Sequence, residues 1–113
     1  MKTKERMKAI CVMADVNRRQ ERLITKTIEE LEELKDVIKD RRVEDFEDKR
    51  ELRARLAEEA ADVSIMIDQL MAELKLGGEF SAMQDYKIYR TVYEMAQEAK
   101  DQLEAGEDAA DED

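Results

Sequence analysis

Residues 49–75 read KRELRARLAEEAADVSIMIDQLMAELK, and this stretch decides the fold because its apolar residues recur at helical spacing. These apolar positions form one stripe along a helix: Leu52, Leu56, Ala60, Val63, Met66, Ile67, Leu70 and Leu74. The spacing predicts a helix over residues 49–75 that ends at Gly77 and Gly78, since glycine readily takes the left-handed conformation of a helix terminus. Two acidic residues break the pattern, because Glu59 falls inside the apolar arc and Asp62 at its edge.

A second amphipathic helix precedes this one, over residues 16–39. Its apolar stripe consists of Ile24, Ile28, Leu31, Leu34 and Ile38. The residues between the two helices, 40–48, are highly charged, and Val43 and Phe46 are their only large apolar groups. We expect a loop there with one helical turn, held down by Phe46. A connection of this length makes the two helices antiparallel neighbours.

The flanking segments predict two further helical pieces. Residues 1–14 indicate a short helix or the first turns of a longer one, with Asp15 and Asn17 as caps that mark a kink. Ser81 is expected to cap a helix over residues 82–105. The side chains expected to face inward from it are Met83, Tyr86, Val92, Tyr93, Ala96, Ala99 and Leu103. The sequence thus predicts one domain over residues 1–105 and an acidic, disordered tail over residues 106–113.

The composition favours helices throughout the chain. Its 113 residues include no Pro, no Trp, no His and only three Gly, whereas good helix formers are abundant. With 44% charged residues, a chain of this length builds only a modest core. We therefore expect an all-α antiparallel helical bundle, with a four-helix-bundle-like core that oligomerisation completes.

The charge and the apolar runs exclude several classes of partner. The net charge of −10 and the lack of a basic stripe argue against a nucleic-acid polymer. No apolar run approaches the length of a membrane span, and the charged N-terminus does not resemble a signal peptide, so we expect a cytoplasmic protein without membrane contact. The single cysteine, Cys11, lies in an apolar run and is interpreted as a core filler.

Four carboxylates form the candidate site. On the helix expected over residues 16–39, Glu30 lies at the edge of the apolar arc and Glu33 just beyond it. The helix expected over residues 49–75 carries Glu59 and Asp62. Residues three apart on a helix are surface neighbours, so two facing helices can present four carboxylates to one ion. Oxygen ligands favour Mg²⁺, with Mn²⁺ as a substitute, and the absence of His argues against zinc.

A structural interpretation competes with the metal site. The chain has 30 acidic residues, so acidic pairs at helical spacing arise easily on solvated faces. The rival function is then a non-catalytic helical oligomerisation or interaction protein. Glu59 discriminates between the two, because an interaction helix would place Leu or Ala within its apolar stripe.

The two acidic motifs together resemble a known family. The string EELEEL contains Glu30 and Glu33 in an E-x-x-E pattern, and EEAADVSIMIDQL contains Glu59 and Asp62 in an E-x-x-D pattern. In this context the chain resembles the MazG-like, all-α nucleoside triphosphate pyrophosphohydrolases over residues 20–95. The resemblance implies a Mg²⁺-dependent cleavage of nucleoside triphosphates to monophosphate and pyrophosphate, as in nucleotide-pool cleansing. It also implies a homo-dimer or tetramer.

The resemblance suggests roles for further residues. Glu29 or Glu58 is expected to orient or deprotonate the attacking water. Lys87 and Arg90 resemble a basic pair in relatives, and Lys26, one turn before Glu30, is another candidate for contact with the substrate. This chain lacks the Trp that many relatives carry near the base, so the preferred base stays undecided.

Overall fold

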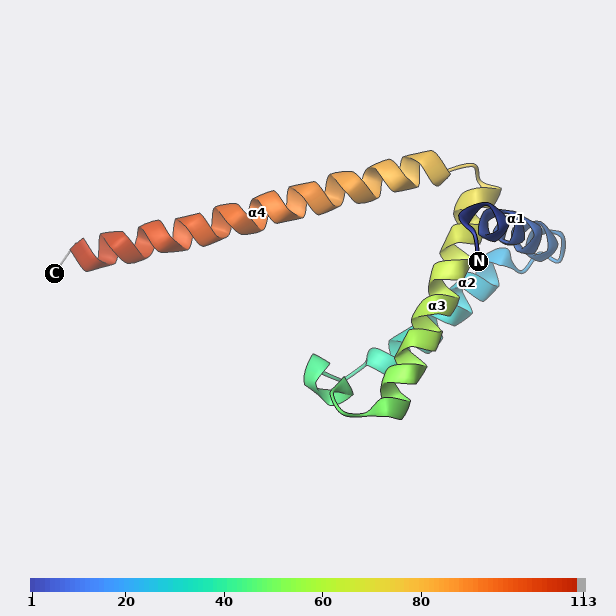
Figure 1. The fold of residues 1–113 in the computed structure, drawn as a ribbon, viewed down its shortest axis with the longest axis horizontal. Helices are drawn as coiled ribbons and strands as arrows, with labels where there is room; N and C mark the ends of the chain where they lie inside the picture. Colours follow the sequence, from blue (N-terminus) through green and yellow to red (C-terminus); the bar gives the residue numbers. More distant parts are fainter. Residues whose placement is uncertain (112–113) are drawn as a thin grey trace. The chain divides into compact units, whose positions relative to one another are not determined.

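The computed structural model describes residues 1–111, and all the regular structure in this part of the chain is helical (Figure 1). The elements are α1 (Thr3–Arg19), α2 (Leu23–Ile38), the 3₁₀ helix η1 (Val43–Phe46), α3 (Arg50–Glu73) and α4 (Gly77–Asp111). The expected all-α class is therefore confirmed. The contacts divide the chain into two compact units, Met1–Gly77 and the segment from Gly78 onward. The prediction of a single domain over residues 1–105 stays a prediction.

Helix α3 is the centre of the first unit. Both α1 and α2 pack against it, and α2 and α3 run in opposite directions on either side of the loop that contains η1 (Figure 1). The buried apolar side chains are few: Ile10, Ala14, Leu23, Val37, Val63 and Met66. The expected helical turn in the loop is present, and Phe46 is half-buried there. The α2–α3 pairing is the part of the fold that positions the candidate site.

A buried polar network joins α1 to α3. Gln69 is fully buried, and its Oε1 accepts a 2.7 Å hydrogen bond from Asn17 Nδ2. Arg22 Nε donates to Asn17 Oδ1 at 2.8 Å, and Gln69 Nε2 donates to Met66 Sδ at 3.4 Å. Because buried polar groups are costly without partners, this network fixes how α1 sits on α3.

The helix boundaries differ from the predictions where residues other than glycine end a helix. Helix α1 continues past the expected kink at Asp15 and Asn17 and ends before Glu21, whose φ is 55°. There the backbone N–H of Arg22 donates to the carbonyl of Asn17, and that of Glu21 to the carbonyl of Arg18. This is the hydrogen-bond pattern of a Schellman motif, and it satisfies the last carbonyls of the helix.

Helix α3 ends in the same way, just before Lys75 and not at the predicted glycines. Lys75 has a φ of 56°, and the N–H of Leu76 donates to the carbonyl of Met71 at 2.8 Å. Gly77 begins α4, so Ser81 is inside that helix and the predicted cap there is wrong. Helix α4 also continues past Gly106 to Asp111, beyond its predicted end, and residues 112–113 of the predicted tail lie outside the described residues.

Several side chains that were expected inside are exposed. On α4, every side chain over residues 81–106 is exposed within its own unit, and the inward orientation predicted for its apolar residues stays a prediction. On α2, the exposed members of the predicted stripe are Ile24, Ile28, Leu31 and Ile38. Cys11 is exposed as well and is not a core filler. An apolar stripe reveals which side chains share a face, but it does not reveal what covers that face.

Helix α2 buries a different face from the predicted one. Its buried residues are Leu23, Thr27 and Val37, which are four and ten residues apart. Thr27 satisfies its hydroxyl within the helix by donating to the carbonyl of Leu23 at 2.7 Å. The face that packs on α3 therefore includes polar residues, among them the half-buried Glu30.

Over residues 1–111, no helix is both long enough and apolar enough to cross a membrane.

Candidate metal centre

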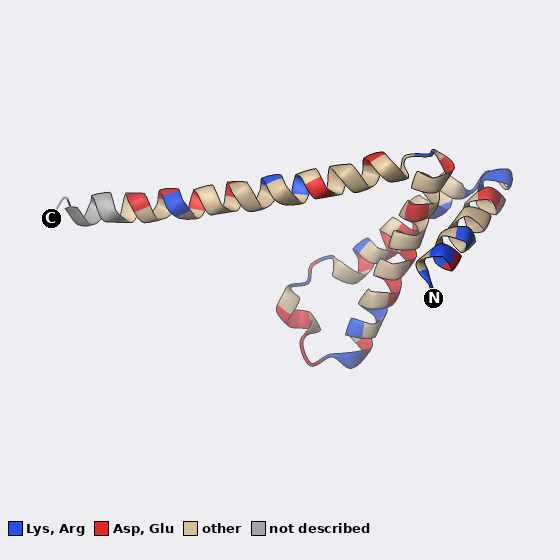
Figure 2. Cartoon of the chain, turned by 45° about the horizontal axis from the view of Figure 1, so that its top comes forward, with Lys and Arg blue, Asp and Glu red and all other residues tan. Residues whose placement is uncertain are grey.

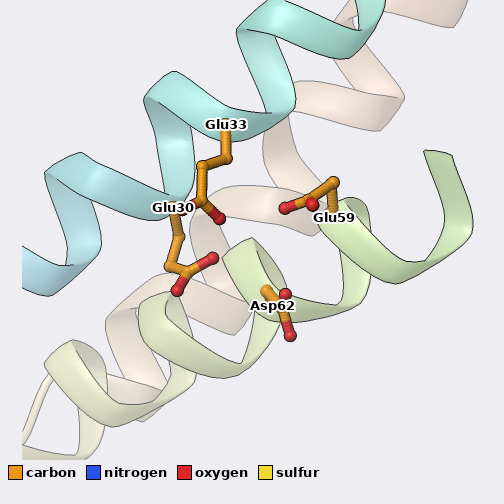
Figure 3. A group of neighbouring side chains, drawn as sticks. All are labelled: Glu30, Glu33, Glu59 and Asp62. Atoms are coloured by element: carbon orange, nitrogen blue, oxygen red, sulfur yellow. The ribbon is translucent and has the colours of Figure 1, made fainter. Parts of the chain in front are cut away.

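Four carboxylates meet where α2 packs against α3. Helix α2 contributes Glu30 and Glu33, and α3 contributes Glu59 and Asp62 (Figure 3). One oxygen atom from each side chain lies within 4.8 Å of the corresponding oxygen of every other. The structure thus brings together all four residues that the spacing placed in one site. Their role as metal ligands stays a prediction.

The packing of the two helices explains this arrangement. Within each helix, residues three apart present their side chains on the same face, one turn from each other. The apolar groups that seal the helix pair flank the carboxylates along the chain: Val37 follows Glu33 by one turn, and Val63 and Met66 follow Asp62. The carboxylates therefore point toward each other because the apolar residues around them hold α2 and α3 together.

Two oxygen atoms in the cluster lack a partner. Glu30, Glu59 and Asp62 are half-buried, whereas Glu33 is exposed. Oε2 of Glu30 and Oε2 of Glu59 are shielded from solvent, and neither accepts a hydrogen bond. A buried carboxylate oxygen without a donor costs free energy, so an arrangement of this kind calls for an electropositive partner.

Burial and mutual repulsion raise the pKa of two of these carboxyls. For Glu30 the main cause of the raised pKa is burial, followed by the neighbouring Glu33 and then by Asp62 and Glu59. For Glu59 the main cause is again burial, followed by Glu33, Asp62 and Glu58. Among the described residues, no Lys or Arg forms a salt bridge with any member of the cluster. The negative charge is therefore uncompensated by the protein.

The residues fit a hard divalent cation. All four ligand groups supply oxygen, and a cation between them would neutralise the repulsion that raises the pKa values. It would also supply the missing partner for Oε2 of Glu30 and of Glu59. The donor set lacks the nitrogen and sulfur ligands typical of zinc.

The remaining predicted site residues lie outside the four-carboxylate cluster. Glu29 and Glu58 are exposed and precede Glu30 and Glu59 in the chain. Of the two, Glu58 influences the cluster directly, because its charge contributes to the raised pKa of Glu59. The proposed action of Glu29 or Glu58 on a water molecule stays a prediction.

The three predicted substrate-binding cations have different surroundings. Lys26 is half-buried and lines a cavity of about 270 Å³ between α1 and α2, together with Asn17 and Arg22. Lys87 and Arg90 are exposed on α4, in the second unit. Arg90 Nε donates to a carboxylate oxygen of Glu94 at 2.9 Å and so takes part in an exposed ion pair within α4. Contact of these cations with substrate stays a prediction.

Sequence reasoning missed a group of basic residues at the loop end of the helix pair. Arg41, Lys49, Arg50 and Arg55 line a hollow of about 600 Å³. The signal was present in the sequence, because two strings, DRR at residues 40–42 and KRELRAR at residues 49–55, stand on either side of the loop. Only the folded loop brings Arg41 beside the start of α3.

Comparisons of the chain with protein-family models, with curated proteins and with solved structures found no match. The resemblance to the MazG-like enzymes therefore depends on the acidic motifs and their apolar context alone.

Proposed function

We propose that the chain is a nucleoside triphosphate pyrophosphohydrolase that depends on a divalent cation and releases a nucleoside monophosphate and pyrophosphate. The observation that carries this proposal is the convergence of Glu30, Glu33, Glu59 and Asp62, with two buried oxygens that lack a partner. A strongly anionic substrate needs such a cation to approach an acidic protein. The proposed role is nucleotide-pool cleansing in the cytoplasm.

The cation of this proposal is Mg²⁺, or Mn²⁺ in its place, held by the four carboxylates. When bound, it would supply positive charge for the phosphate oxygens of the substrate. The protein contributes the packed α2–α3 pair, which brings the four carboxylates together before the cation arrives. Because Glu30 and Glu59 hold protons more tightly than ordinary carboxyls, cation binding should release protons and weaken at low pH.

Further residues complete the proposed site. Glu58 and Glu29 are the candidates for orienting the attacking water and accepting its proton, because each is exposed next to a cluster member. Lys26, Lys87 and Arg90 are the proposed cationic contacts for the phosphate groups.

The proposal includes a homo-oligomer, a dimer or a tetramer, that completes the helical bundle. The exposed apolar side chains support it: Ile24 is 57% exposed and Ile28 is 50% exposed on α2, and on α4 Val92 is 61% exposed. Apolar residues grouped on a helix face in this way usually mark an interface. The same observation favours the rival function, a non-catalytic interaction protein, which needs the interface but no cation.

An assay of pyrophosphate release separates the two functions. The protein is incubated with a panel of ribo- and deoxynucleoside triphosphates, with and without Mg²⁺, and the products are identified by ³¹P NMR. The proposal expects monophosphate and pyrophosphate from at least one nucleotide, only when Mg²⁺ is present. If no nucleotide is cleaved by an oligomeric, folded protein, the interaction function is favoured and the enzymatic one is rejected.

A further inference from the structure

A second charged site lies at the loop end of the α2–α3 pair, and it shares no residue with the carboxylate cluster. It is an open hollow of about 600 Å³, lined by Arg41, Lys49, Arg50, Glu51, Leu52 and Arg55. Four of these six residues are cationic and one is anionic. In a chain with 30 acidic and 20 basic residues, positive charge gathers at this end of the helix pair (Figure 2).

None of the four cations is paired with a carboxylate. Among the described residues, none of Arg41, Lys49, Arg50 and Arg55 forms a salt bridge, although acidic side chains are numerous in the chain. Arg41 is held in place, because its Nη1 donates to the carbonyl of Val37 at 2.6 Å. This bond ties its guanidinium to the end of α2 and leaves most of its N–H groups without a partner.

The start of α3 adds to the positive character of the hollow. A helix N-terminus carries partial positive charge and unpaired backbone N–H groups, and it normally attracts acidic residues. Here Lys49 occupies the N-cap position without a side-chain capping bond, and Arg50 is the first helical residue. Cations at these two positions oppose the helix dipole, whereas Glu51 in the same turn complements it. An anion in the hollow would relieve the remaining mismatch at Lys49 and Arg50.

We propose that this hollow binds an anion with at least two phosphoryl groups, and that it does so without a metal ion. Four cations and one carboxylate leave a net charge of +3 in the lining, which suits a di- or triphosphate, and the fork of an arginine side chain suits phosphate oxygens. The volume lies in the range of small-molecule sites. The backbone N–H groups at the start of α3 add donors that no side chain of the protein caps.

Calorimetric titration of the full chain with inorganic pyrophosphate, in excess EDTA, tests the proposal. The wild type should bind, and the affinity should fall as salt is added. The double variant Arg50→Gln/Arg55→Gln should raise the Kd by about tenfold or more, since two charge-assisted contacts are lost. The single variants Arg50→Gln and Arg55→Gln are measured as well, and their matched control is Arg53→Gln, which removes one positive charge from the same helix at a residue that does not line the hollow. Its Kd should change by less than about twofold.

The proposal would be overturned if pyrophosphate did not bind to the wild type. It would also be overturned if Arg53→Gln raised the Kd as much as Arg50→Gln or Arg55→Gln alone, because pyrophosphate would then respond only to the general positive charge of the helix. Circular dichroism verifies that each variant keeps its helices. A parallel titration with a nucleoside triphosphate, also in EDTA, identifies the source of the phosphates. Tighter binding than that of pyrophosphate through the same arginines assigns a nucleotide, and equal binding assigns the inorganic anion.

The carboxylate variant Glu59→Gln separates this inference from the proposed function. It removes a cluster residue but none of the hollow, so pyrophosphate binding in EDTA should persist in it. Loss of that binding would contradict the separate site, whatever the outcome of the hydrolysis assay.

Discussion

The carboxylate cluster predicts opposite effects of Glu59→Gln with and without a divalent cation. Without a cation, the wild type confines negative charge among half-buried carboxylates, and Oε2 of Glu59 is buried without a partner. Replacing Glu59 by the neutral Gln removes part of the repulsion, so in EDTA at neutral pH the variant should melt at or above the wild-type temperature. With Mg²⁺, the wild type should gain stability that the variant does not gain, because a ligand is missing.

The size of this gain follows from mass action. At a Mg²⁺ concentration of about ten times its Kd, binding to the folded state alone adds about 1.4 kcal/mol to the free energy of unfolding. The cluster lies in the compact unit Met1–Gly77, and for a domain of that size each kcal/mol shifts the melting temperature by about 4–8 °C. The wild type should therefore melt about 6–11 °C higher with Mg²⁺ than in EDTA.

Circular dichroism at the helix band, followed on heating, measures both effects. Glu32→Gln is the matched control, because Glu32 is an exposed residue of α2 that does not belong to the cluster. Its response to Mg²⁺ should equal that of the wild type. If Mg²⁺ raised the melting temperature of Glu59→Gln as much as that of the wild type, the reasoning that links this cluster to the cation would be refuted.

Three further predictions concern the pH dependence, the core and the assembly. In EDTA, the pKa values of Glu30 and Glu59 are higher in the folded chain than the ordinary value of 4.5, so above pH 4.5 the folded chain holds protons that the unfolded chain has released. The free energy of unfolding should therefore fall as the pH rises through the pKa values of the folded chain. The melting temperature of Glu30→Gln/Glu59→Gln should fall less over this range than that of the wild type, and identical profiles would contradict the account. Gln69→Leu should lower the free energy of unfolding by about 1–3 kcal/mol, because it leaves the amide donor of Asn17 buried without an acceptor. Urea unfolding measures this loss, and an unchanged midpoint of the urea transition would argue against the network. Val92→Glu should reduce the mass measured by light scattering if α4 is part of the oligomer interface, whereas a monomeric wild type would reject the proposed assembly.

The carboxylate cluster could be placed from the sequence because it depends on local spacing. Residues three apart share a helix face, and a charged loop over residues 40–48 makes the two helices neighbours. The face that α2 buries was harder to predict, since the helix carries apolar residues on more than one side. The packing selected the face with Thr27 and Glu30 and left Ile24 and Ile28 exposed. That choice depends on the partner helix, which no local pattern describes.

The helix ends and the basic hollow depended on features that the usual sequence signals do not capture. Glu21 and Lys75 take the left-handed conformation that favours glycine, whereas Gly77 lies within a helix. A search for glycine therefore finds neither helix end. The hollow needs Arg41 next to the start of α3, and only closure of the loop around η1 brings them together.

The most direct test of the central claim is the Mg²⁺-dependent release of pyrophosphate by three matched proteins: the wild type, Glu59→Gln and Glu32→Gln. All three are compared at equal concentration on the nucleotide that the wild type cleaves best. The account predicts that the wild type and Glu32→Gln release pyrophosphate at similar rates, and that Glu59→Gln loses the activity while keeping its helices. Undiminished release by a folded Glu59→Gln would contradict the claim that this cluster holds the catalytic cation.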